Sequence, residues 1–154
     1  GWEGFPVRDW FAARYDALYV NTAQVPAAAV VRDDRRLRVV ARHGVGFDSV
    51  DVPAMTRAGV LVTNTPSSMP RPVATIALTF MLALAGKLML KDRLTRTGRW
   101  RERNDHMGVG LTGKTLGVIG AGRIAKELLR MARTFDLSLI ATDPYADRVE
   151  LPTT

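Results

Sequence analysis

Residues 116–125, LGVIGAGRIA, decide the fold of this 154-residue chain. The apolar run Leu116–Ile119 suits a buried strand, and it leads directly into a glycine-rich turn of the form G-x-G-x-x-A. Apolar residues at helical spacing follow over Arg123–Thr134, and a second apolar run covers Leu137–Ala141. A strand, a glycine turn, a helix and another strand in this order predict a βαβ unit with parallel strands.

The glycine turn in this setting is typical of a dinucleotide-binding site. Gly120 permits the tight turn, and Gly122 lets the backbone approach a pyrophosphate. The pyrophosphate would lie at the N-terminus of a helix that begins with Arg123 and Ile124. Asp143, at the end of the second strand, can accept hydrogen bonds from the adenosine ribose hydroxyls and would repel a 2′-phosphate. The pattern predicts an NAD site, with a glycine turn that binds nothing as the alternative.

A second glycine-rich segment, residues 108–115, matches the phosphate-binding pattern G-x-x-x-x-G-K-T in full. Such a loop needs a strand before it and a helix after it, so that backbone N–H groups and the helix dipole face the phosphates. Here the polar residues 101–106 precede the segment, and the strand-like run Leu116–Ile119 follows it. The reversed order predicts a turn that enters a strand, and it disfavours a P-loop nucleotide hydrolase.

The N-terminal half also alternates short strand-like runs with helical patterns, which indicates an α/β fold. Strands are expected at Ala17–Val20, Leu37–Ala41 and Val60–Thr63, and a short helix at Pro26–Arg32. Asp51 is in position to cap a helix that runs through Met55–Ala58, and Gly59 can end that helix in a left-handed turn.

A proline-rich segment, Pro66–Pro72, separates the two halves and indicates a hinge, because proline suits neither a helix interior nor a central strand. The mostly apolar run Val73–Leu90 follows it. Such a run is either a membrane span or a helix buried in a core or at a subunit interface. Its short length, together with Gly86 and Lys87, favours the buried helix, so no membrane partner is expected.

Composition narrows the chemistry further. The chain has no Cys and two His, which excludes a disulfide scaffold and a cysteine nucleophile and leaves little for a metal site. The net charge of +7 comes mostly from Arg, and the spacing in its densest stretch, Arg93–Arg103, does not build one helical face. Nucleic-acid binding is therefore not expected. No apolar signal region opens the chain, so a cytoplasmic location is expected.

Beyond these patterns, the chain resembles the D-isomer-specific 2-hydroxyacid dehydrogenases, a family that includes phosphoglycerate, glycerate and formate dehydrogenases. The resemblance runs from about Tyr15 to Tyr145 and keeps the order and spacing of several motifs. Those motifs are residues 16–18 (DAL), 42–51 (RHGVGFDSVD), 58–66 (AGVLVTNTP), 72–74 (PVA), 98–100 (GRW), 111–117 (LTGKTLG), the glycine turn and 143–145 (DPY).

The resemblance implies a subunit of two domains. Residues 1–66 are similar to part of a flavodoxin-like substrate domain. Residues 67–154 are similar to a hinge, the family's dimerisation helix and the first βαβ of a Rossmann NAD-binding domain. By similarity Val45 touches the nicotinamide side, and the amides of Val45 and Gly46 bind the substrate carboxylate, which the small Gly44 and Gly46 make feasible. NAD, a small 2-hydroxy or 2-keto acid and a homodimer are therefore implied.

Several departures from the family pattern matter. The family's catalytic Arg, His and carboxylate all follow the motif that matches Asp143, so no catalytic residue is expected in this chain. His43 and His106 do not occupy the catalytic position. Asn21, in the substrate-binding region, stands where phosphoglycerate dehydrogenases often have Arg, which disfavours a phosphorylated substrate. Asp136 replaces the Gly that usually ends the first Rossmann helix.

These features predict the N-terminal and central part of an NAD-dependent D-2-hydroxyacid dehydrogenase. The parent protein would transfer a hydride between NAD and a D-2-hydroxy acid or 2-keto acid. The chain alone would be inactive, because the group that exchanges the proton is missing. A non-catalytic NAD-binding interaction protein and, more weakly, a P-loop nucleotide hydrolase are the alternatives.

Overall fold

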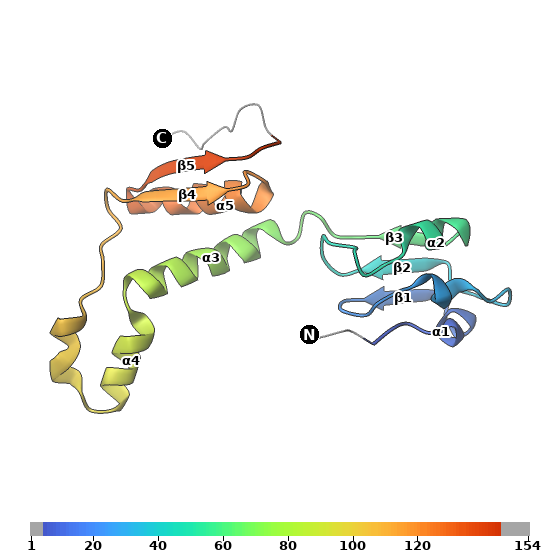
Figure 1. Cartoon of the computed structure of the whole chain (residues 1–154), viewed down its shortest axis with the longest axis horizontal. Helices are drawn as coiled ribbons and strands as arrows, with labels where there is room; N and C mark the ends of the chain where they lie inside the picture. The colour runs from blue at the N-terminus through green and yellow to red at the C-terminus, as the bar shows by residue number, and fades with distance from the viewer. Residues whose placement is uncertain (1–4, 146–154) are drawn as a thin grey trace. The chain divides into compact units, whose positions relative to one another are not determined.

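The computed structural model describes residues 5–145, and the chain divides into two compact units, Gly1–Met69 and Pro70–Thr154. The division falls inside the proline-rich segment 66–72. Each unit is built around a parallel sheet of its own (Figure 1).

The first unit contains a three-stranded parallel sheet in the order β1-β2-β3. Its strands are β1 (Ala17–Val20), β2 (Val39–Arg42) and β3 (Leu61–Thr63), and its helices are α1 (Asp9–Arg14), the 3-10 helix η1 (Ala27–Val30) and α2 (Val52–Arg57). Val20 pairs with Arg42, and Ala41 pairs with Thr63. The carboxyl ends of all three strands therefore meet at one edge of the sheet.

Apolar side chains from strands, helices and loops form the core of this unit. They are Val7, Ala12, Val20, Val25, Ala29, Val30, Leu37, Val40, Val50, Ala54, Met55 and Val60. Asp51 caps α2 by accepting a hydrogen bond at Oδ1 from the Ala54 amide (2.9 Å), and Gly59 turns the chain at φ +69. The predicted strands and capped helix are confirmed, while the predicted Pro26–Arg32 helix is shortened to η1. The sequence did not predict α1, because 6 residues are too few to show a helical period.

The second unit contains the βαβ that the glycine turn predicts. Its elements are β4 (Thr115–Ile119), α5 (Arg123–Ala132), the 3-10 turn η3 (Arg133–Phe135) and β5 (Ser138–Thr142), and β4 and β5 pair in parallel. Ile119 is the partner of Thr142, so the glycine turn after β4 and Asp143 after β5 lie at the same edge of this sheet. On one side α5 packs against α3, and its Leu129 and Ala132 are buried.

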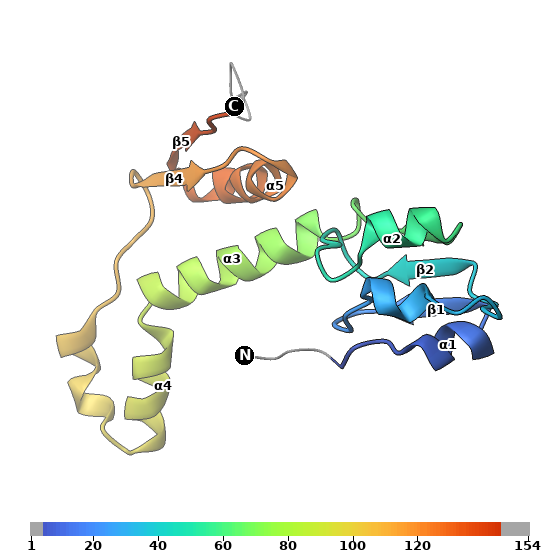
Figure 2. The same cartoon turned by 45° about the vertical axis from the view of Figure 1, so that its right-hand side comes forward.

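The apolar run Val73–Leu90 does not form the single helix that its composition suggests. It is divided between α3 (Pro70–Ala85) and α4 (Leu88–Arg96), which are bent by 59° relative to each other (Figures 1 and 2). Lys87 between them has a left-handed backbone at φ +51. The Ala85 carbonyl accepts a hydrogen bond from the Val109 amide (2.8 Å), whereas in a continuous helix it would accept one from an amide of the same helix. Within residues 5–145 no single helix is long and apolar enough to cross a membrane, and only this bent pair has the length and composition together.

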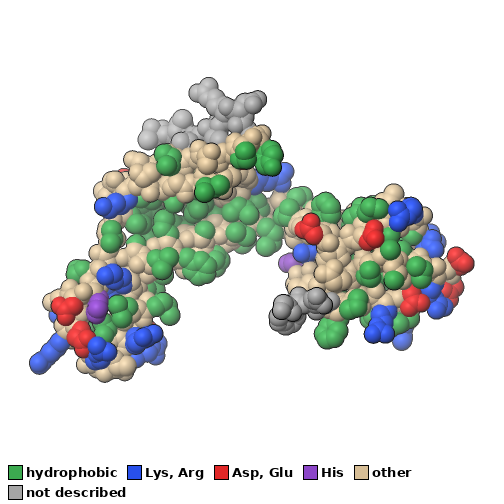
Figure 3. All heavy atoms as spheres, in the orientation of Figure 1, with side chains coloured by type: hydrophobic (Ala, Val, Ile, Leu, Met, Phe, Trp, Pro, Cys, Tyr) green, Lys and Arg blue, Asp and Glu red, His purple; other side chains and the backbone are tan. Residues whose placement is uncertain are grey.

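The α3 helix is also more exposed than a buried helix would be. Within α3 only Ala74 is buried, and its exposed large apolar side chains are Val73, Ile76, Phe80, Leu82 and Leu84. Figure 3 shows hydrophobic side chains gathered along this helix. Of the two settings that were predicted for the run, burial in a core of its own chain is wrong, and burial at a subunit interface stays a prediction. After α4, the polar connection forms a 3-10 helix, η2 (Trp100–His106).

Asp136 ends the α5–η3 segment with a left-handed backbone at φ +54. An L side chain is disfavoured in this region and glycine is not. The carbonyl of Asp136 accepts a hydrogen bond from the Gly113 amide (2.9 Å), and glycine would keep that bond. We therefore expect Asp136→Gly to raise the free energy of unfolding by about 1 kcal/mol in thermal or urea denaturation. Asp105→Gly, at a residue without a positive φ, is the matched control and should not stabilise. An equal or lower stability of Asp136→Gly would contradict the expectation.

Candidate functional site

The carboxyl edge of the first sheet brings together three segments of the chain. Asn21 follows β1, residues 43–46 follow β2, and Asn64 and Thr65 follow β3. Loops at the carboxyl ends of parallel strands are where α/β proteins usually bind ligands. The predicted substrate-binding residues Asn21, Gly44, Val45 and Gly46 all lie at this edge.

Hydrogen bonds with Thr65 and Asn64 hold the loop after β2 in place. The Thr65 hydroxyl oxygen accepts from the Gly44 amide (2.9 Å), and the Thr65 amide donates to the Gly44 carbonyl (2.9 Å). The Asn64 side-chain amide donates to the Val45 carbonyl (2.8 Å). Gly44 has φ +104, a backbone conformation that glycine tolerates and other residues rarely adopt.

These bonds determine where the next two amides point. In a planar trans peptide the N–H lies opposite the C=O of the same peptide unit. Because the Gly44 and Val45 carbonyls both face the segment after β3, the N–H groups of Val45 and Gly46 point away from it. Neither amide donates to any atom of residues 5–145. Two successive free N–H groups on one side of a loop form a concave site for an anion.

Arg42 places a cation beside this loop. Its guanidinium lies against Gly44, with Nη1 3.3 Å from the position that a Cβ on Gly44 would occupy. Its Nε and Nη1 atoms are buried and have no hydrogen-bond partner in the described part of the chain. Two buried, unpaired guanidinium nitrogens favour an anion nearby. Arg42 was not predicted as a site residue, because a single Arg at the end of a strand-like run shows neither its burial nor its lack of a partner.

On the face of β2 opposite to the Arg42 side chain, Tyr19 and His43 form a polar pair. The Tyr19 hydroxyl and His43 Nδ1 are hydrogen bonded, and the two rings meet edge to face with centroids 5.8 Å apart. Both side chains are exposed, Tyr19 to 72%. The spacing of these residues gave no sign of this pair, because it depends on the register between β1 and β2.

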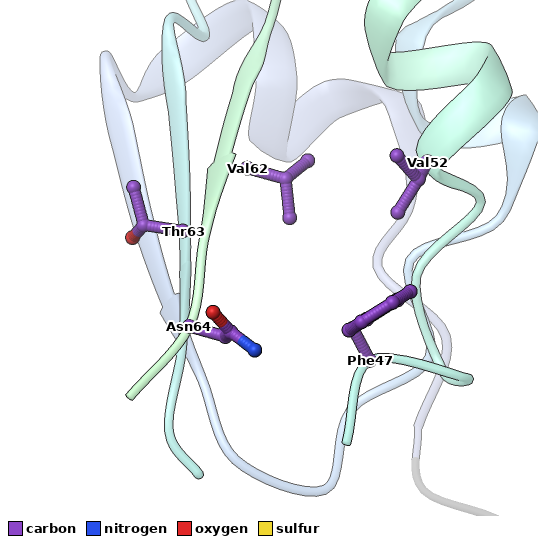
Figure 4. Close-up of a pocket in the computed structure, with 5 residues that line it drawn as sticks. All are labelled: Phe47, Val52, Val62, Thr63 and Asn64. Atoms are coloured by element: carbon purple, nitrogen blue, oxygen red, sulfur yellow. The ribbon is translucent and has the colours of Figure 1, made fainter. Parts of the chain in front are cut away.

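A pocket of about 200 Å³ opens next to β3. It is lined by Phe47, Val52, Val62, Thr63 and Asn64 (Figure 4). Val62 and Val52 face each other across it, while the Thr63 side chain points to the other side of the strand. The Val45 carbonyl faces the Asn64 side chain that lines this pocket, so the free amides of Val45 and Gly46 open away from it.

In the second unit, the glycine turn has the backbone that its sequence predicts. Gly120 follows β4 at φ +87, and its amide donates to the Thr142 carbonyl (2.7 Å). Gly122 is the N-cap of α5, which begins at Arg123, and no atom lies within 4 Å of the position that a Cβ on Gly122 would occupy. Ile124, in the first turn of α5, is 42% exposed. The turn thus leaves open space at the N-terminus of α5, where anions are favoured.

Asp143 is joined to this turn directly. Its Oδ2 accepts from the Ala121 amide (2.7 Å), and its Oδ1 accepts from the Tyr145 amide (2.9 Å). The backbone N–H groups of Tyr145 and Ala121 lower the pKa of Asp143, because they stabilise its ionised form. Each carboxylate oxygen has a second lone pair, so Asp143 can still accept from a ligand hydroxyl.

The second glycine-rich segment lacks the surroundings of a phosphate-binding loop. Gly113 turns the chain at φ +71, and Thr115 opens β4, so the segment ends in a strand. The reversed order predicted from the sequence is confirmed. Within residues 5–145 no group of three or more His, Cys, Asp or Glu could hold a metal ion.

Comparison with known proteins identifies the relatives of the chain. Residues 78–153 match the family described as D-isomer specific 2-hydroxyacid dehydrogenase, NAD binding domain. The D-3-phosphoglycerate dehydrogenase of Archaeoglobus fulgidus is 35% identical over 135 residues, which are 88% of this chain and 25% of that protein. The hydroxypyruvate reductase of Thermotoga maritima is 35% identical over 137 residues, which are 89% of this chain and 44% of that protein. The chain spans less than half the length of either relative.

Comparison with solved structures indicates a fold of the same kind. The solved structure of the TT0316 protein from Thermus thermophilus has a TM-score of 0.84 and 26% identity, and it covers 94% of this chain and 47% of its own. Parallel strands with a glycine turn between strand and helix define the class of dinucleotide-binding α/β proteins. The family match and the relatives together support the presence of a fragment of the D-isomer-specific 2-hydroxyacid dehydrogenase family in this chain.

Proposed function

We propose that this chain supplies the first part of the NAD site and the substrate-carboxylate site of an NAD-dependent D-2-hydroxyacid dehydrogenase. One observation carries the cofactor assignment: the open glycine turn and the Asp143 carboxylate lie together at the carboxyl edge of β4 and β5. The pyrophosphate would lie on the amides at Gly122, Arg123 and Ile124, and the adenosine ribose on Asp143. Bound NAD supplies the hydride acceptor or donor.

The substrate assignment rests on the loop after β2. A 2-keto acid carboxylate would accept hydrogen bonds from the free amides of Val45 and Gly46, and the Arg42 guanidinium would provide the compensating charge. Val45, which is 45% exposed, would also face the nicotinamide. The likeness to the phosphoglycerate dehydrogenase and the hydroxypyruvate reductase supports a small 2-hydroxy or 2-keto acid as the substrate class.

The roles of the two units and of the catalytic groups belong to the same proposal. We assign residues 1–66 to the substrate domain and residues 67–154 to the hinge, the dimerisation helix and the start of the NAD domain. Reduction of a 2-keto acid needs a proton at the oxygen that becomes the hydroxyl. In the proposed enzyme the Arg, His and carboxylate that serve this oxygen belong to sequence beyond the motif that contains Asp143, and none of these 154 residues is catalytic.

Asp143 tests the cofactor assignment. The full-length protein should bind NADH more tightly than NADPH, because the Asp143 carboxylate accepts from the ribose hydroxyls and repels a 2′-phosphate. Asp143→Ala should narrow the difference between the NADH and NADPH affinities, since it removes both the ribose acceptor and the repulsive charge. Asp143→Asn should weaken NADH less, because it removes the charge but keeps an acceptor. Fluorescence titration with NADH and NADPH measures the ratio, and Asp105→Ala, an exposed aspartate in η2, is the matched control. Equal affinities in the unchanged protein would contradict the assignment.

The exposed side of α3 supports a homodimer. Val73, Ile76, Phe80 and Leu84 follow one another at helical spacing and are 37%, 52%, 62% and 78% exposed. An apolar stripe of this length is unusual on a soluble monomer, and a second copy of the helix would cover it. We expect light scattering at micromolar concentration to give the mass of a dimer, and Phe80→Glu together with Leu84→Glu to give a monomer. Arg96→Glu, on the exposed surface of α4, serves as the control, and a monomeric unchanged protein would contradict the proposal.

A further inference from the structure

Another cavity of the first unit, with a volume of about 290 Å³, lies between η1 and α2, which pack against each other. The helix α2 begins after the loop at the carboxyl edge of the sheet and ends shortly before β3, so its last turn lies toward the amino edge. The connection through η1 runs from β1 to β2 in the same direction. Val30 and Ala58, at the C-terminal ends of η1 and α2, line the cavity, and none of the proposed substrate-binding residues does. The cavity is therefore separate from the proposed substrate site.

Most of the lining is apolar. The side chains that form it are Ala27, Val30, Val31, Ala54 and Ala58. Val30 and Ala54 belong to the core of the unit, whereas Ala27 and Val31 are exposed. The volume is close to the lower limit of about 300 Å³ for small-molecule pockets. The space thus suits a small molecule with a short aliphatic part.

Arg35 contributes a guanidinium that is held in place. Its Nη1 donates to the Arg32 carbonyl (3.0 Å), and its Nη2 donates to the Ala58 carbonyl (3.0 Å). A guanidinium has about five N–H donors, so these bonds leave donors for a ligand. Ala58 is the C-cap of α2. Arg35 therefore also covers a carbonyl at the negative end of this helix, which would otherwise disfavour an anion.

Arg57, in the last turn of α2, supplies a second guanidinium. Its side chain forms no hydrogen bond or ion pair within residues 5–145. The acidic residues nearest in sequence to Arg35 are Asp33 and Asp34, and neither lines the cavity. Asp34 is bound to Arg32, and η1 and α2 contain no acidic residue. Two guanidinium groups without a carboxylate partner thus line one cavity, which favours an anionic ligand.

We propose that this cavity binds a small aliphatic carboxylate, with its carboxylate on Arg35 and Arg57 and its alkyl chain on the apolar lining. The planar fork of an arginine matches the two oxygens of a carboxylate. Apart from the two arginines, only Ala and Val side chains line the cavity. A polar chain would lose its hydrogen bonds to water there without replacing them, so the lining selects an alkyl chain.

The test measures binding of 3-methylbutanoate, 3-methylbutan-1-ol and inorganic phosphate to the full-length protein by calorimetry. We expect 3-methylbutanoate to bind more tightly than the other two. Arg57→Gln should weaken its binding about 10-fold, the effect of one charge-assisted hydrogen bond. Arg38→Gln, at an exposed arginine that does not line the cavity, is the control for loss of charge and should leave binding unchanged.

A second pair of variants tests the cavity without removing a charge. Ala27→Leu fills part of the cavity from an exposed position and should also weaken binding. Ala28→Leu, at an exposed neighbour outside the lining, is its control. Unchanged affinity for 3-methylbutanoate in Arg57→Gln and Ala27→Leu would overturn the site.

The remaining outcomes separate this site from the substrate loop. Loss of 3-methylbutanoate binding in Arg42→Ala, with none in Arg57→Gln, would place the carboxylate on the loop after β2 and overturn the proposal. Binding of the alcohol or of phosphate as tight as that of 3-methylbutanoate would contradict the ligand class, and absence of binding would contradict the site. None of these results bears on the dehydrogenase function, because no residue of this cavity belongs to the proposed NAD or substrate site.

Discussion

Gly122→Asp is expected to lower the affinity for NADH on the order of 100-fold while leaving the fold intact. The effect is large because the new carboxylate would occupy the space that the pyrophosphate approaches and would add a like charge at the N-terminus of α5. The fold should tolerate the change. Gly122 has φ −69, which any residue adopts, and no atom lies within 4 Å of the added Cβ.

A substitution at Gly122 tests cofactor binding with less risk to the fold than a substitution at Gly120 does. Gly120 has φ +87, so a substitution there would strain the turn itself. Gly110, which also has no atom within 4 Å of an added Cβ, provides the control Gly110→Asp outside the turn. Fluorescence titration with NADH and a melting curve are measured for both variants. Unchanged NADH affinity in Gly122→Asp, with an intact fold, would show that the cofactor does not bind on this turn.

Arg42→Ala is expected to raise the KM for a 2-keto acid on the order of 100-fold, with kcat changed much less. The carboxylate is present in the ground state and in the transition state alike, so losing its charge partner weakens both equally. Arg42→Lys should recover part of the loss, because it restores the charge without the planar fork of donors.

The stability of the same variant distinguishes a ligand-binding cation from a structural one. The Nε and Nη1 atoms of Arg42 are buried without a partner in the described residues, so Arg42→Ala removes no hydrogen bond from these atoms. Its melting temperature should therefore not fall. Arg38→Ala, an exposed arginine just before β2, is the control for loss of positive charge in the same unit. An unchanged KM in Arg42→Ala would remove Arg42 from the anion site.

The second unit could be predicted because its signals are local. A strand, Gly120, Gly122 and a helix follow one another without a gap, so their order alone separates this turn from the P-loop pattern at residues 108–115. Asp143 lies at the end of the next strand, and parallel pairing brings it to the turn whatever the details of packing.

The remaining features depend on contacts between distant residues. The roles of Asn64 and Thr65 come from hydrogen bonds to the loop after β2, and the isolation of Arg42 comes from packing. The Tyr19–His43 pair depends on the register of β1 with β2. The break between α3 and α4 was not predicted, although Gly86 and Lys87 interrupt the apolar run where it occurs. The contact that accompanies it, between Val109 and Ala85, lies far away in the sequence.

The central claim is that this chain belongs to an enzyme that passes a hydride between NAD and a D-2-hydroxy acid. The most direct test is NADH oxidation by the full-length protein with glyoxylate, pyruvate, hydroxypyruvate and 2-ketoisocaproate, followed by chiral analysis of the products. We expect NADH oxidation with at least one of these acids, faster than with NADPH, and the D isomer wherever the product is chiral. Tight NADH binding without oxidation by any keto acid, or formation of the L isomer, would contradict the account, and the first result would instead indicate a non-catalytic NAD-binding protein.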